Sequence, residues 1–246
     1  MLLRLTLVAV IGSLLAGCRQ ALPPAPHWRE VAPGMEVRQF GDPSNPEQRQ
    51  LTAVRIVPQH WTFHVVDVHH GVSGQGAEVE TVCPPLGAAI NGSYFAEDMA
   101  PLGLLVVDGK VVQHHFPRHE WGAFRIRNGR PEVVRSVAGR LRGVRQALEC
   151  KPRLIVHGKL QRFKPQGSAR RSAVGIDGRG RVIFAATGDY LTLEQWAAVL
   201  RKECGCVEAL NLDGGPSTQL AVRGQVNVTL SGGWPVPVFL TASPRK

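Results

Sequence analysis

Three glycine-containing segments of the sequence supply side chains that could bind and cleave a phosphate ester. They are residues 89–95 (AINGSYF), 170–176 (RRSAVGI) and 209–217 (ALNLDGGPS). Together they hold amides, a guanidinium, a carboxylate and a hydroxyl. A guanidinium can grip two phosphate oxygens, and a carboxylate can serve as nucleophile, base or electrostatic support beside an oxocarbenium-like carbon. We therefore predict that the three segments fold around one cleft.

The same segments, in this order, resemble the motifs of the phosphodiester glycosidase family. NGSYF, RSAVGI and NLDGGPST correspond to that family's Asn-Gly-Gly-Phe-Phe-like, Arg-Thr-Ala-Ile-Gly-like and Asn-Leu-Asp-Gly-Gly-Gly-Ser-like segments. Residues 191–193 (LTL) and 152–154 (PRL) match as well, so that the resemblance covers roughly residues 50–242. Pro216 departs from the pattern, because proline has no amide hydrogen to offer an anion.

This resemblance implies which residues form the site. Asp213 and Arg171 are expected to be catalytic, and the expected substrate-binding residues are Asn91, Gly92, Asn211, Gly214, Gly215 and Ser217. Structural roles remain as alternatives: an Asx turn for Asp213, an ion pair for Arg171 and a left-handed turn for Asn91. The candidates for a second carboxylate are Glu97, Asp98 and Asp189.

The histidines and cysteines do not predict a metal site. His69-His70 and His114-His115 are adjacent pairs, and neighbouring residues of a strand point to opposite faces. No EF-hand loop is present. We expect no cofactor and no metal, with a structural or catalytic Ca²⁺ left open. Four cysteines could form disulfides or stay as buried thiols: Cys83, Cys150, Cys204 and Cys206.

The N-terminus predicts export and lipid attachment. Arg4 precedes an apolar run over residues 5–15, which is shorter than the ~20 residues that span a bilayer, so residues 1–17 are typical of a signal peptide. Residues 15–18 (LAGC) resemble a lipobox, so we expect acylation, including palmitate, at Cys18. The alternative is an ordinary secretory signal. A Pro/Ala-rich tether is expected over residues 18–34, and the catalytic domain over residues 35–246. The expected location is the bacterial cell envelope, on the periplasmic face of the outer membrane in a Gram-negative cell.

The charge balance favours an anionic partner. The chain has 29 Lys+Arg and 19 Asp+Glu; loss of Arg4 with the signal peptide leaves 28 against 19, a balance of +9. This suits a phosphorylated glycan or sugar phosphodiester. The basic residues are scattered and no nucleic-acid motif is present, so no nucleic-acid partner is expected. The sequence leaves the oligomeric state open.

The elements that must position these residues are mostly strands. Short apolar runs separated by Gly, Pro, Asn and Asp predict strands at 51–57, 61–68, 102–107, 110–113, 121–127, 132–135, 154–156, 172–176, 182–186, 207–212, 219–222 and 225–230. Asp108-Gly109 and Asn128-Gly129 predict hairpin turns. Residues 51–57 and 61–68 are interpreted as neighbouring strands.

One helix is predicted with both of its ends. Thr192 and Gln195 form a capping box, an apolar stripe with helical spacing follows, and Gly205 ends it. A second helix is expected near residues 76–82. The predicted fold is a single α+β domain with a mixed or antiparallel β-sheet core and a few helices.

The sequence therefore predicts a hydrolase that cleaves the sugar C1–O–phosphate bond of a glycosyl-1-phosphodiester in the cell envelope. The alternative from another class is a non-catalytic glycan- or anion-binding envelope lipoprotein on the same fold. A phosphodiesterase that cuts the P–O bond is a third reading, but such enzymes normally use a metal cluster.

Overall fold

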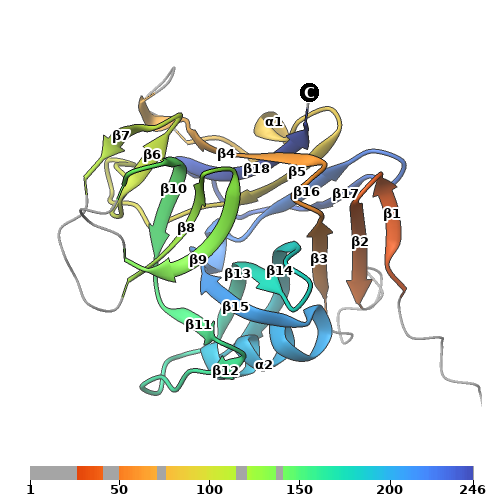
Figure 1. Ribbon diagram of the computed structural model, residues 1–246. Coiled ribbons are helices and arrows are strands. Elements are labelled where there is room, and N and C mark those ends of the chain that lie inside the picture. The colour runs from red at the N-terminus through yellow and green to blue at the C-terminus, as the bar shows by residue number, and fades with distance from the viewer. Residues whose placement is uncertain (1–26, 41–49, 71–75, 115–120, 137–140, 246) are drawn as a thin grey trace, which may run out of the picture.

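Three antiparallel β-sheets and two α-helices form the described part of the chain, residues 27–40, 50–70, 76–114, 121–136 and 141–245 of this computed structural model (Figure 1). Every pairing between neighbouring strands is antiparallel. The antiparallel alternative of the predicted sheet core is therefore confirmed, no mixed sheet is found among the described residues, and the fold is mainly β rather than the predicted α+β. Within these residues, neither helix is both long and apolar enough to cross a membrane.

The first and largest sheet carries two of the three motif segments. Its eight strands follow the order β1-β2-β3-β14-β13-β15-β11-β12. Their bounds are β1 (Arg29–Ala32), β2 (Met35–Phe40), β3 (Leu51–Ile56), β11 (Arg153–Val156), β12 (Lys159–Leu160), β13 (Ala169–Asp177), β14 (Val182–Leu191) and β15 (Cys206–Asn211). Since β1 starts at Arg29, the folded part begins inside the segment predicted as a tether.

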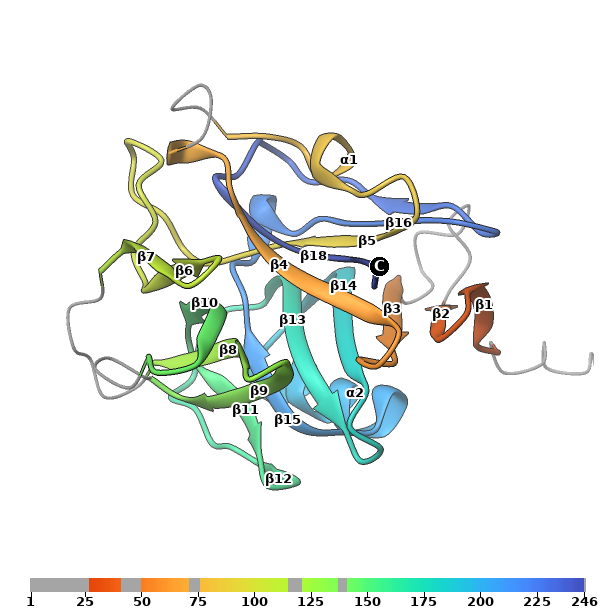
Figure 2. The same cartoon turned by 45° about the horizontal axis from the view of Figure 1, so that its top comes forward.

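Two smaller sheets complete the β-structure. The second has the order β7-β6-β10-β8-β9 and the third β17-β16-β5-β18-β4. The bounds in the second are β6 (Leu105–Val107), β7 (Lys110–Gln113), β8 (Gly122–Arg127), β9 (Arg130–Arg135) and β10 (Val144–Cys150). Those in the third are β4 (Trp61–Asp67), β5 (Gly87–Asn91), β16 (Leu220–Arg223), β17 (Val228–Leu230) and β18 (Val238–Pro244). Figure 2 shows β4, β18 and β5 crossing over β13 and β14.

The main core lies where the three sheets face each other. Phe63 of β4 makes edge-to-face contacts with Phe124 of β8 and Phe184 of β14, both with ring centroids 6.2 Å apart. These rings come from three different sheets and are all at least 96% buried. Aromatic burial of this kind dominates core stability, so it fixes how the sheets sit around the site.

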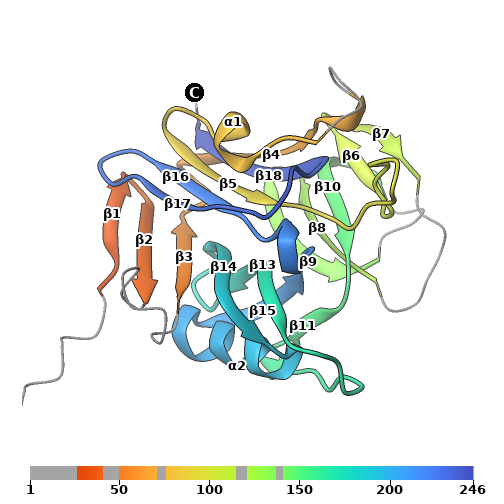
Figure 3. The same ribbon diagram turned by 180° about the vertical axis from the view of Figure 1, so that it is seen from behind.

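Helix α2 (Leu193–Cys204) covers the opposite face of the first sheet (Figure 3). Its buried Trp196, Ala197 and Leu200 belong to a core cluster with residues of β3, β13, β14 and β15. Thr192 and Gln195 form the predicted capping box, and Gly205 ends the helix with φ 70°. The predicted helix is confirmed. The second predicted helix is the single turn α1 (Val79–Val82).

Local turn rules also hold. Asp108-Gly109 joins β6 to β7 and Asn128-Gly129 joins β8 to β9. All four of these residues have positive φ, from 49° to 84°, as a type I′ hairpin turn requires. Both predicted hairpins are confirmed.

Three sequence-based expectations differ from the structure. β3 and β4 are consecutive strands but do not pair, because β3 lies between β2 and β14 whereas β4 pairs with β18. His69 and His70 lie beyond the end of β4, and their rings touch edge to face at 4.8 Å instead of pointing to opposite sides. The four described cysteines are free thiols, so the disulfide alternative is not realised. Cys18 lies outside the described residues.

Candidate active site

The three motif segments meet where the third sheet crosses the first. The first segment spans the end of β5, the second lies in β13 from its second residue, and the third spans the end of β15 and the turn after it. Two main-chain hydrogen bonds join them: Leu212 N donates to Ser172 O at 2.9 Å, and Asp213 N donates to Gly92 O at 3.0 Å. The segments therefore converge as predicted, whereas the cleft that they were expected to share is lined by residues of the first two segments and by none of the third.

Asn91 holds this junction together. Its side chain is 0% exposed, and its Nδ2 donates to Asp213 O at 2.8 Å. Its Oδ1 accepts from Ser172 Oγ at 2.7 Å and from Gln219 N at 3.1 Å. Asn91 is thus a positioning residue for the Asp213 loop, and its expected contact with a sugar stays a prediction.

Asp213 is the acidic group at the centre of the junction. Its side chain is partly exposed, its Oδ1 accepts from Gly214 N at 2.9 Å, and the Ser217 hydroxyl donates to the carboxylate. Burial raises the pKa of Asp213 to about 6, while these two hydrogen bonds oppose the rise. The local loop bond of the structural alternative is thus present, together with an unusual pKa. Perturbed carboxyl pKa values are concentrated at functional sites.

Arg171 lies beside the Asp213 loop. A Cβ added to Gly214 would stand 3.9 Å from Arg171 Cδ. The guanidinium donates from Nε to Leu191 O at 2.9 Å and from Nη2 to Gly167 O at 3.0 Å. It forms no ion pair with any described residue, so the structural ion pair is not found there. Carbonyls therefore occupy the Nε–Nη2 edge, and Nη1 has no hydrogen-bond partner among the described residues.

Tyr94 and Asn211 link Asp213 to a neighbouring cleft. Asn211 is 1% exposed, and its Nδ2 donates to Tyr94 Oη at 3.2 Å, to Lys151 O at 3.1 Å and to Leu212 O at 2.7 Å. Tyr94 Oη donates to Lys151 O at 3.0 Å. Burial raises the pKa of Tyr94 far above its usual range, with the charge of Asp213 adding to the rise. Tyr94 is therefore a neutral hydroxyl close to the carboxylate.

This cleft has a volume of about 770 Å³, and its lining includes Tyr94 and Arg171. Its other basic lining residues are Arg135, Lys151, Arg153, Arg162 and Lys164, and no Asp or Glu is among the described residues that line it. Sites that bind small molecules have similar volumes. The sequence analysis gave none of these five a role, although the PRL match at 152–154 contains Arg153.

The remaining predicted substrate-binding residues take two kinds of position. Gly92 and Ser217 are buried, and Ser217 Oγ accepts from Trp234 Nε1 at 3.1 Å while it donates to Asp213. Gly214 and Gly215 are partly exposed next to Asp213. Gly214 is necessary for packing, because an added Cβ would stand 2.7 Å from Arg170 O. The half-exposed Trp234, which the sequence analysis missed, is thus connected to the carboxylate through Ser217.

The three candidates for a second carboxylate differ from Asp213 in their exposure and hydrogen bonds. Glu97 and Asp98 are exposed, and Asp98 Oδ1 accepts from Ala100 N at 3.0 Å. Asp189 Oδ1 accepts from Gln50 N at 3.0 Å, which ties it to the start of β3. Among the described residues, no group of three or more His, Cys, Asp and Glu side chains could hold a metal ion.

Buried polar atoms that lack a partner among the described residues recur in the motif segments. They include Ser93 Oγ, Arg170 Nε, Asn211 Oδ1 and Thr218 Oγ1. Buried polar atoms normally have a hydrogen-bond partner. Their concentration beside Asp213 is typical of a site that takes up water or a polar ligand.

The sequence from residue 86 to residue 242 matches the family described as phosphodiester glycosidase. No curated protein matches the chain by sequence.

Three solved structures share the fold. The catalytic domain of zebrafish N-acetylglucosamine-1-phosphodiester alpha-N-acetylglucosaminidase, auto-inhibited by its pro-peptide, has a TM-score of 0.70 at 18% identity, over 89% of this chain and 86% of that one. A hypothetical protein from Synechocystis has 0.66 at 17%, over 92% of this chain and 64% of its own length. A protein from Burkholderia pseudomallei K96243 has 0.62 at 15%, over 80% and 74%. At these identities the likeness concerns the fold alone.

Proposed function

The chain belongs to the phosphodiester glycosidase family, and from this we propose that it hydrolyses the C1–O bond of a glycosyl-1-phosphodiester. The observation that carries the proposal is the position of Asp213. Its partly exposed carboxylate lies at the junction of the three family motifs. Tyr94, whose hydroxyl senses the charge of Asp213, and Arg171, which lies beside the Asp213 loop, both line a cleft of basic residues. A sugar phosphodiester needs both an anionic and a cationic group at the bond that breaks.

Cleavage of that bond requires a negative group of the protein near C1 and a positive group near the phosphate. As the C1–O bond breaks, its electron pair leaves with the phosphate oxygen and C1 becomes oxocarbenium-like. The ionised Asp213 carboxylate would stabilise or attack C1, and water finally supplies the hydroxyl of the free sugar. Arg171, with Lys151 nearby, would bind the departing phosphate. A phosphate monoester has a second pKa near 6, so it leaves with little general-acid help and the site does not require a second carboxylate.

We also propose that the enzyme works in the bacterial envelope, anchored through lipid at Cys18. The support is the N-terminal sequence: a short apolar run and an LAGC segment. Outer-membrane placement on the periplasmic face follows the same reasoning for a Gram-negative cell.

Release of free sugar tests the proposed activity. Residues 19–246 would be incubated with the methyl phosphodiester of a sugar 1-phosphate, in which the sugar is varied. We expect turnover that falls by about 10²–10³-fold in Asp213→Asn and in Arg171→Ala, the usual cost of removing a group that stabilises transition-state charge. The exposed Glu97→Gln and Arg130→Ala serve as matched controls and should keep the activity.

Water labelled with oxygen-18 identifies the bond that breaks. Label in the sugar indicates C–O cleavage, whereas label in the phosphate would overturn the glycosidase mechanism in favour of a phosphodiesterase. Binding of the ester without turnover in the wild-type protein would instead support the non-catalytic lipoprotein.

A further inference from the structure

The cations of the cleft beside Asp213 exceed what one phosphodiester requires. Six of its lining residues are basic: Arg135, Lys151, Arg153, Arg162, Lys164 and Arg171. None of the six forms an ion pair with any residue in the described ranges, although elsewhere Arg55, Arg125 and Arg181 are paired with carboxylates. The charged residues that line the described part of the cleft all carry the same sign, and such a cleft concentrates ligands of the opposite sign.

The six cations are arranged by depth. Arg171, next to the Asp213 loop, is 8% exposed, and Lys151 and Arg153 are half-buried. Arg135, Arg162 and Lys164 are exposed. They come from the end of β9 and from the segment after β12, elements that lie close to β11 at one side of the molecule (Figure 1). The positive charge therefore extends from the buried floor to the rim.

One phosphate group cannot use all of this charge. A single diester bound at Arg171 and Lys151 carries one negative charge, and the remaining cations would be left to repel each other. A ligand with phosphates at several points along its length would meet them in turn. Lys151 also lies over the Trp121 ring, with Nζ 5.8 Å from the centroid. Its position is thus partly fixed by an aromatic wall of the cleft.

On the premise of the proposed function, we infer that the leaving side of the substrate is a sugar-phosphate or polyol-phosphate chain that carries further phosphates beyond the scissile one. Arg171 and Lys151 bind the scissile phosphate, and Arg135, Arg162 and Lys164 bind the next phosphates of the chain. A neutral glycan on the leaving side would leave the outer cations without a ligand.

The test compares two substrates with the same sugar. In one, the sugar 1-phosphate is esterified to methanol; in the other, it is esterified to a glycerol phosphate trimer. The full chain, purified in detergent, is expected to favour the trimer in kcat/KM by about tenfold or more at low salt, and high salt should remove most of this preference.

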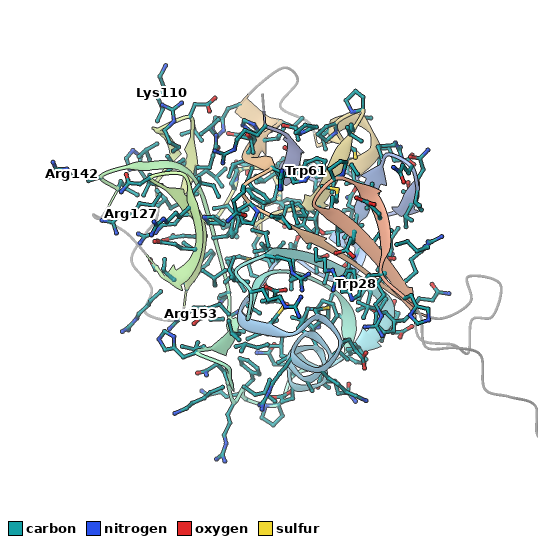
Figure 4. The ribbon with its side chains drawn as sticks, turned by 45° about the vertical axis from the view of Figure 1, so that its right-hand side comes forward. Trp28, Trp61, Lys110, Arg127, Arg142 and Arg153 are labelled. Carbon is teal, nitrogen blue, oxygen red and sulfur yellow. The ribbon has the colours of Figure 1, made fainter. Side chains whose placement is uncertain are left out.

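Two triple variants separate a local effect from one of net charge. Arg135→Gln/Arg162→Gln/Lys164→Gln should reduce the preference for the trimer about tenfold. Lys110→Gln/Arg127→Gln/Arg142→Gln removes the same charge from exposed positions on the outer side of the second sheet (Figure 4) and should leave the preference intact. A preference that survives the cleft variant, or falls equally in both, overturns the inference.

Direct binding keeps the inference separate from the proposed function. If neither substrate is turned over, the proposed function fails, and the Kd of the free glycerol phosphate trimer then decides. Tighter binding by the wild-type protein than by the cleft variant supports the inference, and equal binding overturns it. A thymidylate trimer that binds as tightly as the glycerol phosphate trimer also overturns it, because the cleft would then be a nucleic-acid site.

Discussion

The surroundings of Asp213 predict how the activity depends on pH. Its pKa is raised to about 6 by burial, and each role proposed for it requires the ionised form. We therefore expect kcat/KM to fall as the pH drops below about 6. Ser217→Ala removes a donor that lowers this pKa, so the acidic limb should move to higher pH. Thr81→Ala, at an exposed position of α1, is the control for both pH–rate profiles. An unmoved limb in Ser217→Ala would contradict this account.

The same raised pKa makes Asp213 a cost to stability. A carboxyl whose pKa rises from 3.8 unfolded to about 6 folded binds more protons in the native state between those values, so the free energy of unfolding falls as the pH rises through that window. Above about pH 6 the full cost is present. At about 1.4 kcal/mol per unit, it is at most about 3 kcal/mol.

Asp213→Asn should consequently be more stable than the wild-type protein at pH 8, by about 1–3 kcal/mol, and the difference should shrink at pH 4. Urea unfolding at the two pH values measures it. An Asn variant that is less stable at pH 8 would show that the ionised carboxylate is well solvated or paired, contrary to the structure.

From the sequence, the loops that form the site can be predicted more accurately than the side chains that line it. Three predicted site residues at the junction are partly exposed: Asp213, Gly214 and Gly215. Arg171 is also at the junction, and its hydrogen bonds to described residues use only Nε and Nη2. The amides that look most like ligand contacts, Asn91 and Asn211, are buried and bind the main chain. Residue type alone cannot separate these cases, because a buried amide and a ligand-binding amide have the same chemistry.

At the scale of elements, the contact of β5 with β18 fixes where the Asp213 loop sits. Gly92 follows β5, its N donates to Val238 O at 2.7 Å, and its O accepts from Asp213 N. A Cβ at Gly92 would stand 2.7 Å from Val238 Cγ1 and 2.9 Å from Val238 O. The chain therefore has no room for a side chain at this point.

Gly92→Ala should accordingly lose both stability and activity. Overpacking of this kind costs about 1–3 kcal/mol, and displacement of Asp213 should lower kcat/KM by at least about tenfold. Gly178→Ala is the matched control, since its added Cβ would meet only Val207 Cγ1 at 3.9 Å. Thermal unfolding and initial rates measure the two effects. Equal behaviour of the two variants would contradict the role of this contact.

Elements with local signals are the ones that could be predicted. The hairpin turns at Asp108-Gly109 and Asn128-Gly129 and the capped helix α2 depend on neighbouring residues alone. β18 was not predicted, and its pairing with β5 and β4 joins residues that are more than a hundred positions apart. β3 and β4 were expected to pair but belong to different sheets, because the pairing of strands depends on non-local contacts.

At the scale of the whole molecule, β1, which follows the expected lipid anchor, lies on the side opposite to β9, β11 and β12, the strands around the basic cleft (Figure 1). β1 begins at Arg29, so ten residues, and eleven steps from Cα to Cα, separate it from Cys18. In an extended, proline-rich form such a linker reaches roughly 35 Å, at about 3.1 Å per residue. This length is sufficient to hold a folded domain clear of the lipid headgroups while keeping it near a substrate of the envelope.

Lipid attachment at Cys18 predicts how the whole protein distributes in the cell. The wild-type chain, expressed in a bacterium, should incorporate labelled palmitate and sediment with membranes, because two or more acyl chains anchor a protein stably. Cys18→Ser should lose the label and leave the membrane fraction. Cys83→Ser is the control, since Cys83 is a free thiol within the folded domain, and it should keep both. A Cys18→Ser protein that still carries palmitate would place the anchor elsewhere. An unlabelled one that still sediments would show that the positive surface or the uncleaved apolar run binds the membrane without a lipid.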